Sequence, residues 1–419
     1  MTAHSGSSSE RSDETRATRS VNRRRFLRAA GGGLAATGLA GCLGGGGGGD
    51  SQGAFTVGAN LALSQGWSPW GNTILNAAEL AAQEINDNGG LGPNGREIEF
   101  VVEDNQVDPS TARTKAEQLI QQDDADILLG TISSSTRVAV SPVAAQNEIP
   151  LLYSVQYEGQ VAEDYCNEWL FKTGGVPVQT VEPFVPWLVD EYGGQFYMLG
   201  SDYNWPHRIN EVAKPILREA GGEVVGEEYV QLGTTDFSSI IERVSQADPD
   251  VLFMTLTGPS PTAIQSQMTN QDVRGQWTDV GLAHGQGSLS GADPETVEGV
   301  ITCHNYAERM QNDLNQTMIE SYYGEFGDDV LVNYMTGPAY VSIKLLEQAV
   351  EAAGDTLPSA IKEALPETGL DDSAVGTARF ENDHQLTNDA VAKRMTAEKT
   401  HEVVETFDPV APDDGCDPI

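Results

Sequence analysis

Phe55-Thr56-Val57-Gly58-Ala59-Asn60-Leu61 opens the part of the chain that decides the fold. This apolar run predicts a buried strand, and residues 98–103 predict a second one. Between them lies a predicted helix over about 71–88, which ends at a pair of glycines. Its apolar side chains recur at helical spacing: Ile74, Leu75, Ala78, Ala82 and Ile85. The segment therefore predicts a strand–helix–strand unit.

The same alternation continues along the chain. Further strands are predicted at 127–129, 149–155, 195–199, 223–230 and 251–256, and further helices at 108–122, from 134, at 206–220 and at 238–247. Apolar strands between amphipathic helices predict parallel sheets that are covered on both faces. So many units exceed one sheet, so we expect an α/β fold of two Rossmann-like lobes.

Three hinge crossings are expected to join these lobes, near 173–178, 301–307 and 376–382. The first lobe would comprise 54–174 and 306–377, and the second 175–305 and 378–410, followed by an acidic tail over 411–419.

The first 53 residues differ in composition from the rest. Arg23 and Arg24 lie in a segment that matches the twin-arginine export pattern, and a short Ala/Gly-rich apolar stretch follows over 29–40. Leu39-Ala40-Gly41-Cys42 resembles a lipobox, in which Cys42 becomes the lipidated N-terminus. We therefore expect a signal peptide over 1–42, a Gly-rich linker over 43–53, and a lipid-anchored protein on the extracellular face of the cell membrane.

The charge balance excludes one class of partner. The 419 residues include 24 Lys and Arg against 62 Asp and Glu, a formal net charge of −38. Binding to nucleic acid needs clustered cations, so no nucleic-acid partner is expected. Acids dispersed in this way are typical of adaptation to molar salt, which screens their repulsion.

Sequence patterns that would indicate catalysis or a cofactor are missing. The chain has no Gly-x-Ser-x-Gly elbow, no His-Glu-x-x-His pair and no Cys-x-x-Cys pair, and the glycine-rich run over 285–291 is one residue too long for a dinucleotide fingerprint. We therefore expect neither an enzyme nor a metal or other cofactor. Any two of Cys166, Cys303 and Cys416 could form one disulfide, and the sequence does not choose the pair. Asn315 begins a glycosylation sequon that can equally be a chance match.

Ligands of parallel α/β sheets bind beyond the carboxyl ends of the strands. Four loops at predicted strand ends are rich in hydroxyl and aromatic residues: 64–70, 130–136, 153–159 and 200–206. Ser133, Ser134 and Ser135 begin a predicted helix, whose free N–H groups suit a carbonyl or a carboxylate. We expect the four loops to meet at one ligand site.

Three motifs carry a resemblance to a known family. Residues 153–159 are similar to Tyr-x-x-Gln/Pro-Tyr-Glu-Gly, and residues 200–210 to Gly-Ser-Asp-Tyr-x-aromatic-Pro-x-x-x-Asn. Residues 221–240 match a third motif that begins Gly-Gly-x-Val. With these motifs the chain resembles type I periplasmic-binding proteins, the substrate-capturing components of ABC importers, and within them the urea- and short-chain-amide-binding branch.

The resemblance implies a receptor that closes on urea or a short-chain amide and then docks on an ABC permease. Aromatic walls and polar contacts from both lobes would hold the ligand. The candidate ligand-binding residues are Ser133, Ser134, Ser135, Tyr153, Gln156, Tyr157, Asp202, Tyr203 and Trp205.

At one position the chain departs from urea-binding proteins, which usually carry an aromatic residue where Ile132 stands. Residues 133–136 are instead similar to the serine run of branched-chain amino-acid receptors. A branched-chain or polar amino acid is therefore the alternative ligand, with Asp202 or Glu158 facing its ammonium group. An amide-sensing regulator and an amidase are further alternatives.

Overall fold

The computed structural model describes residues 53–64, 66–159, 167–284, 292–327, 330, 332–380 and 384–411. The export signal at Arg23 and Arg24, the lipidation site at Cys42, two of the cysteines (Cys166 and Cys416) and most of the acidic tail lie outside these residues.

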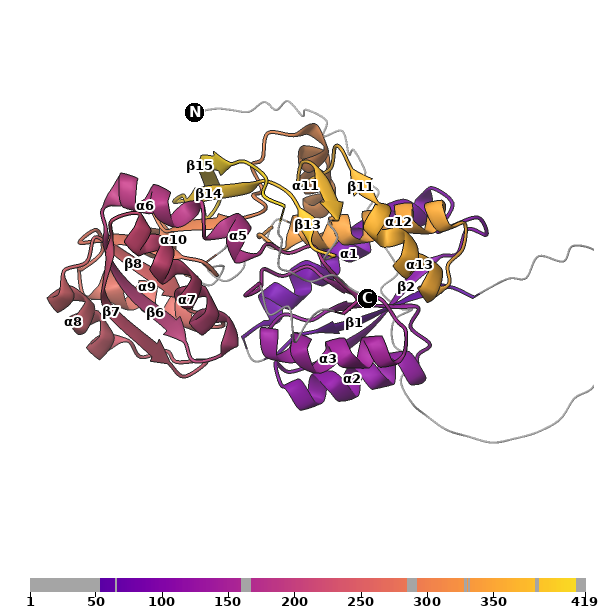
Figure 1. Cartoon of the computed structure of the whole chain (residues 1–419), viewed down its shortest axis with the longest axis horizontal. Coiled ribbons are helices and arrows are strands. Elements are labelled where there is room, and N and C mark those ends of the chain that lie inside the picture. The colour runs from indigo at the N-terminus through magenta and orange to yellow at the C-terminus, as the bar shows by residue number, and fades with distance from the viewer. Residues whose placement is uncertain are drawn as a thin grey trace, which may run out of the picture. The chain divides into compact units, whose positions relative to one another are not determined.

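The first lobe is built on a parallel five-stranded sheet in the order β2-β1-β3-β4-β5. Helices α2 and α3 pack together on one side of it, and α1 and α12 on the other (Figure 1). The strands are β1 (Phe55–Leu61), β2 (Ile98–Asp104), β3 (Ile127–Gly130), β4 (Leu151–Tyr153) and β5 (Leu170–Lys172). The helices are α1 (Ser68–Asp87), α2 (Pro109–Gln121), α3 (Ser134–Gln146), α11 (Asp313–Phe326), α12 (Thr336–Ala353) and α13 (Pro358–Ala364), with a 3-10 turn η1 (Leu365–Glu367).

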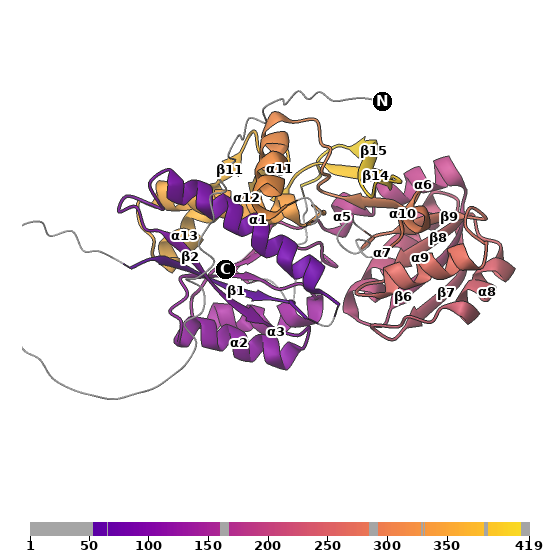
Figure 2. The ribbon, with the colours of Figure 1, turned by 180° about the vertical axis from the view of Figure 1, so that it is seen from behind.

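The second lobe is built on a seven-stranded sheet in the order β15-β14-β10-β9-β8-β6-β7. Its strands run in one direction except β14, which pairs antiparallel with both β10 and the edge strand β15. Views from opposite sides show α7 and α9 on opposite faces of this sheet (Figures 1 and 2).

The strands of this sheet are β6 (Gln195–Ser201), β7 (Glu223–Val230), β8 (Val251–Thr255), β9 (Thr278–Gly281), β10 (Ile301–His304), β14 (Ala390–Met395) and β15 (His401–Phe407). The helices are α5 (Pro177–Thr180), α6 (Phe184–Tyr192), α7 (Asn204–Glu219), α8 (Ser238–Ala247), α9 (Ser260–Asn270) and α10 (Pro294–Val297). The predicted α/β class with two parallel-sheet lobes is therefore confirmed.

Local sequence explains where the helices begin. Asp108 precedes α2 and accepts a hydrogen bond from the backbone N–H of Thr111 at 2.7 Å, and Pro109 occupies the first turn, as the sequence predicted. Ser133 caps α3 in the same way, accepting from the N–H of Thr136 at 3.2 Å. Helix α1 begins three residues earlier than predicted, because Pro69 again suits a first helical turn.

The third passage between the large sheets differs from the expectation. The sequence placed it near 376–382, but β12 (Ala378–Phe380) and β13 (Leu386–Thr387) pair with β11 (Gly369–Leu370) in a separate antiparallel sheet. The chain reaches the seven-stranded sheet only at β14. These strands are too short to give a periodic signal in the sequence.

Buried side-chain amides tie the three passages together. Asn305 donates to the carbonyl of Thr173 at 3.2 Å, and Asn388 donates to the carbonyl of Asn305 at 3.3 Å. Gln385 donates to the carbonyl of Gly174 at 2.8 Å. Each passage is thus hydrogen-bonded to another where few regular strand bonds exist.

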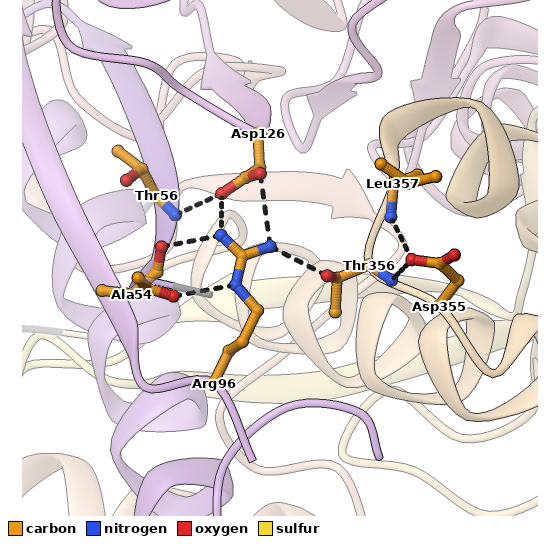
Figure 3. A network of polar contacts seen from close by, with 8 residues as sticks. Ala54, Thr56, Arg96, Asp126, Asp355, Thr356 and Leu357 are labelled. Carbon is orange, nitrogen blue, oxygen red and sulfur yellow. Dashed lines mark hydrogen bonds and ion pairs between the residues drawn. The ribbon is translucent and has the colours of Figure 1, made fainter. Parts of the chain in front are cut away.

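The amino edge of the first sheet is closed by one arginine (Figure 3). Arg96 forms an ion pair with Asp126 at 2.8 Å and donates to the carbonyl of Ala54 at 2.7 Å and to the hydroxyl of Thr356 at 2.8 Å. Asp126 in turn accepts from the N–H of Thr56. One planar guanidinium therefore joins the start of β1, the loop before β3 and the loop after α12, which a lysine could not do.

Two side chains flagged in the sequence are buried. Cys303 in β10 is a free thiol, and it has no exposed surface. Asn315 is fully buried, and its amide donates to the carbonyl of Glu308 at 2.8 Å. The sequon is therefore inaccessible in the folded chain. Among the described residues, no helix is long and apolar enough to cross a membrane.

Candidate ligand-binding site

Loops from both lobes line a small hollow, in which about 300 Å³ is free of protein atoms when the part open to solvent is included. Most of them follow the carboxyl ends of parallel strands, which is where α/β sheets bind ligands. The described residues that line it are Trp67, Trp70, Ile132, Ser134, Val155, Gln156, Tyr203, Trp205, Thr257, Ala283 and Tyr334.

Aromatic rings form much of the wall. Trp67 and Trp70 meet edge to face at the start of α1, with ring centroids 4.7 Å apart, and Tyr334 stacks on His304 at 3.9 Å. Burial raises the pKa of the Tyr203 and Tyr334 hydroxyls well above their ordinary range, so both stay neutral. The part of the wall formed by the described lining residues is uncharged.

Two glycines allow the loops to come this close. A Cβ at Gly71 would lie 2.2 Å from the carbonyl oxygen of Ala62, so only glycine lets α1 start directly above the end of β1. A Cβ at Gly174 would lie 2.1 Å from the carbonyl group of Val155. Gly174 therefore lets the first passage between the lobes run against the loop that carries Val155 and Gln156.

Gln156 presents a fixed hydrogen-bond acceptor. The Thr180 hydroxyl donates to the carbonyl of Val176 at 3.1 Å, so it accepts from Nε2 of Gln156 at 2.9 Å. This leaves Oε1 of Gln156 buried and without a partner among the described residues. A buried acceptor in this state favours a ligand that donates a proton to it.

Trp205 presents the complementary donor. Its indole Nε1–H is buried and has no partner among the described residues. An indole nitrogen can only donate. Two residues of the lining therefore carry a buried unpaired acceptor, on Gln156, and a buried unpaired donor, on Trp205.

Behind Ser134 lies a buried ion pair. Ser134 donates to Oε2 of Glu158 at 2.6 Å, and Nη2 of Arg137 contacts Oε1 of Glu158 at 2.8 Å. The Arg137 and Glu158 side chains are 0% and 2% exposed. The guanidinium lies over the rings of Tyr153 and Tyr157, 5.3 and 4.9 Å from their centroids. Neither charge reaches the lining directly.

The structure brings four of the predicted site residues into the lining: Ser134, Gln156, Tyr203 and Trp205. It does not bring in the other five. Ser133 is occupied as the cap of α3, and Ser135 is not among the lining residues. Tyr153 donates its hydroxyl to the carbonyl of Ile132 at 3.0 Å, and its ring, like that of Tyr157, packs on Arg137.

A ligand contact from Asp202 stays a prediction, because the structure places this residue outside the lining. It was expected to contact the ligand, but its side chain is 65% exposed and pairs with Nε2 of His207 at 2.7 Å. In the turn after β6, Tyr203 and Trp205 turn inward, whereas Asp202 faces solvent above the start of α7. It is not part of the lining.

Sequence reasoning missed part of the site. Thr257 and Ala283 follow β8 and β9, so the same rule about strand ends could have found them. Trp67 and Trp70 lie in a loop that the sequence marked as unusual without assigning either residue. Tyr334 precedes α12 and follows no strand, so no local signal marks it.

The fold agrees with comparisons to known proteins. Residues 54–400 match the family described as periplasmic binding protein, and the chain belongs to that family. It is similar to the Leu/Ile/Val-binding protein homolog 1 of Brucella suis biovar 1, with 23% identity over 331 residues, which cover 78% of this chain and 85% of the relative.

Solved structures are similar at the level of the fold. A solute-binding protein of an ABC transporter from R. palustris in complex with benzoate has a TM-score of 0.78 at 19% identity, covering 86% of this chain and 99% of that one. The branched-chain amino acid transporter substrate-binding protein of Streptococcus pneumoniae in complex with isoleucine has a TM-score of 0.75 at 19% identity, covering 86% and 100%. The comparisons thus place the chain in a family of binding proteins rather than enzymes.

Proposed function

We propose that this protein captures urea or a short-chain amide in the hollow between its lobes. One observation carries the proposal. Among the described residues that line the hollow none is an acid or a base, while Gln156 offers an unpaired acceptor and Trp205 an unpaired donor. A neutral amide has both an N–H and a carbonyl group, so it satisfies both atoms without burying a charge.

An amino acid fits these contacts less well. Its ammonium group needs an acid, and the two acids considered for that role are occupied elsewhere. Asp202 faces solvent beside His207, and both oxygens of Glu158 already accept hydrogen bonds, from Ser134 and Arg137.

A carboxylate ligand is the second candidate. The first backbone N–H groups of α3 point out of the helix and favour negative charge. The relatives named above include proteins with benzoate or isoleucine bound and proteins named for Leu, Ile and Val. The aromatic wall would also suit an aromatic acid.

Binding would work by closure of the two lobes. A ligand that touches Ser134 and Gln156 on one side and Trp205 on the other stabilises the closed arrangement over the open one. The passages tied by Asn305 and Gln385 would act as the hinge, and the closed form would then dock on an ABC permease.

The leader would set the location. We propose export by the twin-arginine pathway and anchoring through lipid on Cys42. Cys42→Ser should move the protein from the membrane fraction to the medium, and retention at the membrane would contradict the anchor.

Calorimetric titration tests the ligand. In molar KCl, we expect saturable heat with urea, acetamide or formamide, and none with leucine, isoleucine or valine. Trp205→Phe removes the indole donor and keeps an aromatic ring, so it should weaken amide binding by about 10-fold or more.

Asp202→Ala is the matched control in the same loop. Because Asp202 lies outside the lining, this variant should keep the affinity of the wild type. Heat with amino acids or benzoate but with no amide would refute the proposal and support the carboxylate candidate.

A further inference from the structure

Ser134 lines the hollow, and its hydroxyl donates to the carboxylate of Glu158, which lies behind the lining. Among the described lining residues, Ser134 alone has its hydroxyl proton directed in this way. A serine hydroxyl has one proton and two lone pairs. At 2.6 Å, the Ser134 proton lies on the bond to Oε2 of Glu158. What remains for the hollow is the acceptor side of the Ser134 oxygen.

Arg137 forms the ion pair that keeps Glu158 an acceptor for the Ser134 hydroxyl. The guanidinium is always charged, and it contacts the other oxygen of Glu158 at 2.8 Å. A carboxylate in an ion pair accepts hydrogen bonds and donates none. The proton of Ser134 therefore has a fixed direction, away from the ligand.

We propose that the Arg137–Glu158–Ser134 chain sets the class of ligand, because it makes Ser134 an acceptor that selects N–H groups and rejects carboxylates. Neither Arg137 nor Glu158 needs to touch the ligand, so both are positioning residues. This inference rests on the proposed function and adds the rule of discrimination to it.

Gln156 works in the same direction. Its Oε1 atom is also held as an acceptor, through Thr180, so the hollow contains two oriented acceptors. An amide nitrogen can donate to such atoms, whereas a carboxylate of the same shape would place oxygen against oxygen. The N–H groups at the start of α3 favour a carboxylate ligand. The Ser134 oxygen, whose proton points away from the hollow, has the opposite effect and disfavours a carboxylate.

The test compares amides with carboxylates of the same shape. The full chain is titrated with acetamide and acetate, propionamide and propionate, and benzamide and benzoate. The measured quantity is the ratio of the amide affinity to the carboxylate affinity within each pair. General damage to the fold would weaken both ligands and would not shift this ratio consistently toward the carboxylate. We expect the wild type to bind the amide of a pair more tightly.

Glu158→Gln is the decisive variant. The new side-chain amide can donate to Ser134 while its oxygen still accepts from Arg137, so the Ser134 proton becomes free to turn into the hollow. The amide-to-carboxylate ratio should fall by about 10-fold or more. Ser135→Ala, one residue along α3 and outside the lining, should leave the ratio unchanged.

Ser134→Ala decides the matter if the Glu158 variant does not fold, as judged by circular dichroism. It removes the acceptor, leaves the Arg137–Glu158 pair in place, and should also lower the ratio. An unchanged ratio in folded Glu158→Gln, or in Ser134→Ala where the former is unfolded, overturns this inference but leaves amide binding intact. A wild type that binds no amide, or prefers the carboxylates, refutes both the inference and the proposed function.

Discussion

Arg137→Met is expected to destabilise the folded protein by about 3–5 kcal/mol, because it leaves the Glu158 carboxylate buried without its cation. Both side chains are almost fully buried, so water cannot replace the lost charge. The substitution also takes away the group on which Tyr153 and Tyr157 pack. Denaturation by guanidinium chloride, followed by circular dichroism, measures the loss.

A double variant separates charge from packing. Arg137→Met together with Glu158→Gln removes both buried charges, and replacing a whole buried pair costs far less than breaking it. The double variant should therefore be more stable than Arg137→Met alone. A loss below about 1 kcal/mol in the single variant would contradict a strongly desolvated pair.

The second large effect is a loss of stability in mild acid, caused by buried histidines. Burial lowers the pKa of His284 to about 3 and that of His384 to about 4. Burial, with Lys393 nearby, holds the pKa of His304 and His401 well below the ordinary value. All four stay neutral in the folded protein where the unfolded chain takes up protons.

The direction of the pH dependence follows from these shifts. Below pH about 6.5 the unfolded state binds more protons, so stability falls as the pH falls toward about 4. Each such histidine contributes up to about 1.4 kcal/mol per pH unit. Asp279, whose pKa burial raises to about 6, acts in the opposite direction over part of this range.

A variant isolates the histidine effect from other groups. His284 is fully buried, and neither ring nitrogen has a partner among the described residues. His284→Leu should reduce the slope of unfolding free energy between pH 6.5 and 5 relative to the wild type. Equal slopes in the wild type and in His284→Leu would show that His284 does not bear on acid stability.

Much of the fold follows from local patterns in the sequence. The strand at 55–61 and the helix capped at Asp108 agree with the structure, because an apolar run and a capping residue act over a few neighbours. The small sheet that contains β12 and β13 was not predicted. Its two- and three-residue strands depend on partners distant in the sequence rather than on their own periodicity.

The candidate site was predicted only in part, because the direction of its side chains also depends on contacts between residues distant in the sequence. The strand-end rule and the family motifs located the loops that carry Ser134, Gln156 and Tyr203, but not the direction of each side chain. Asp202 and Tyr203 are neighbours in one turn, yet one faces solvent and the other the hollow. Tyr153 and Tyr157 face Arg137, a contact that depends on tertiary packing and leaves no trace in the spacing.

The aromatic wall also gives the protein an optical reporter of its own state. Of the six tryptophans in the chain, Trp67, Trp70 and Trp205 line the hollow. A ligand that displaces water there or bonds to the Trp205 indole changes the surroundings of half of the fluorophores at once. The intensity and wavelength of the intrinsic emission should therefore follow occupancy without any attached dye, which makes this receptor a starting point for a label-free sensor of its own ligand.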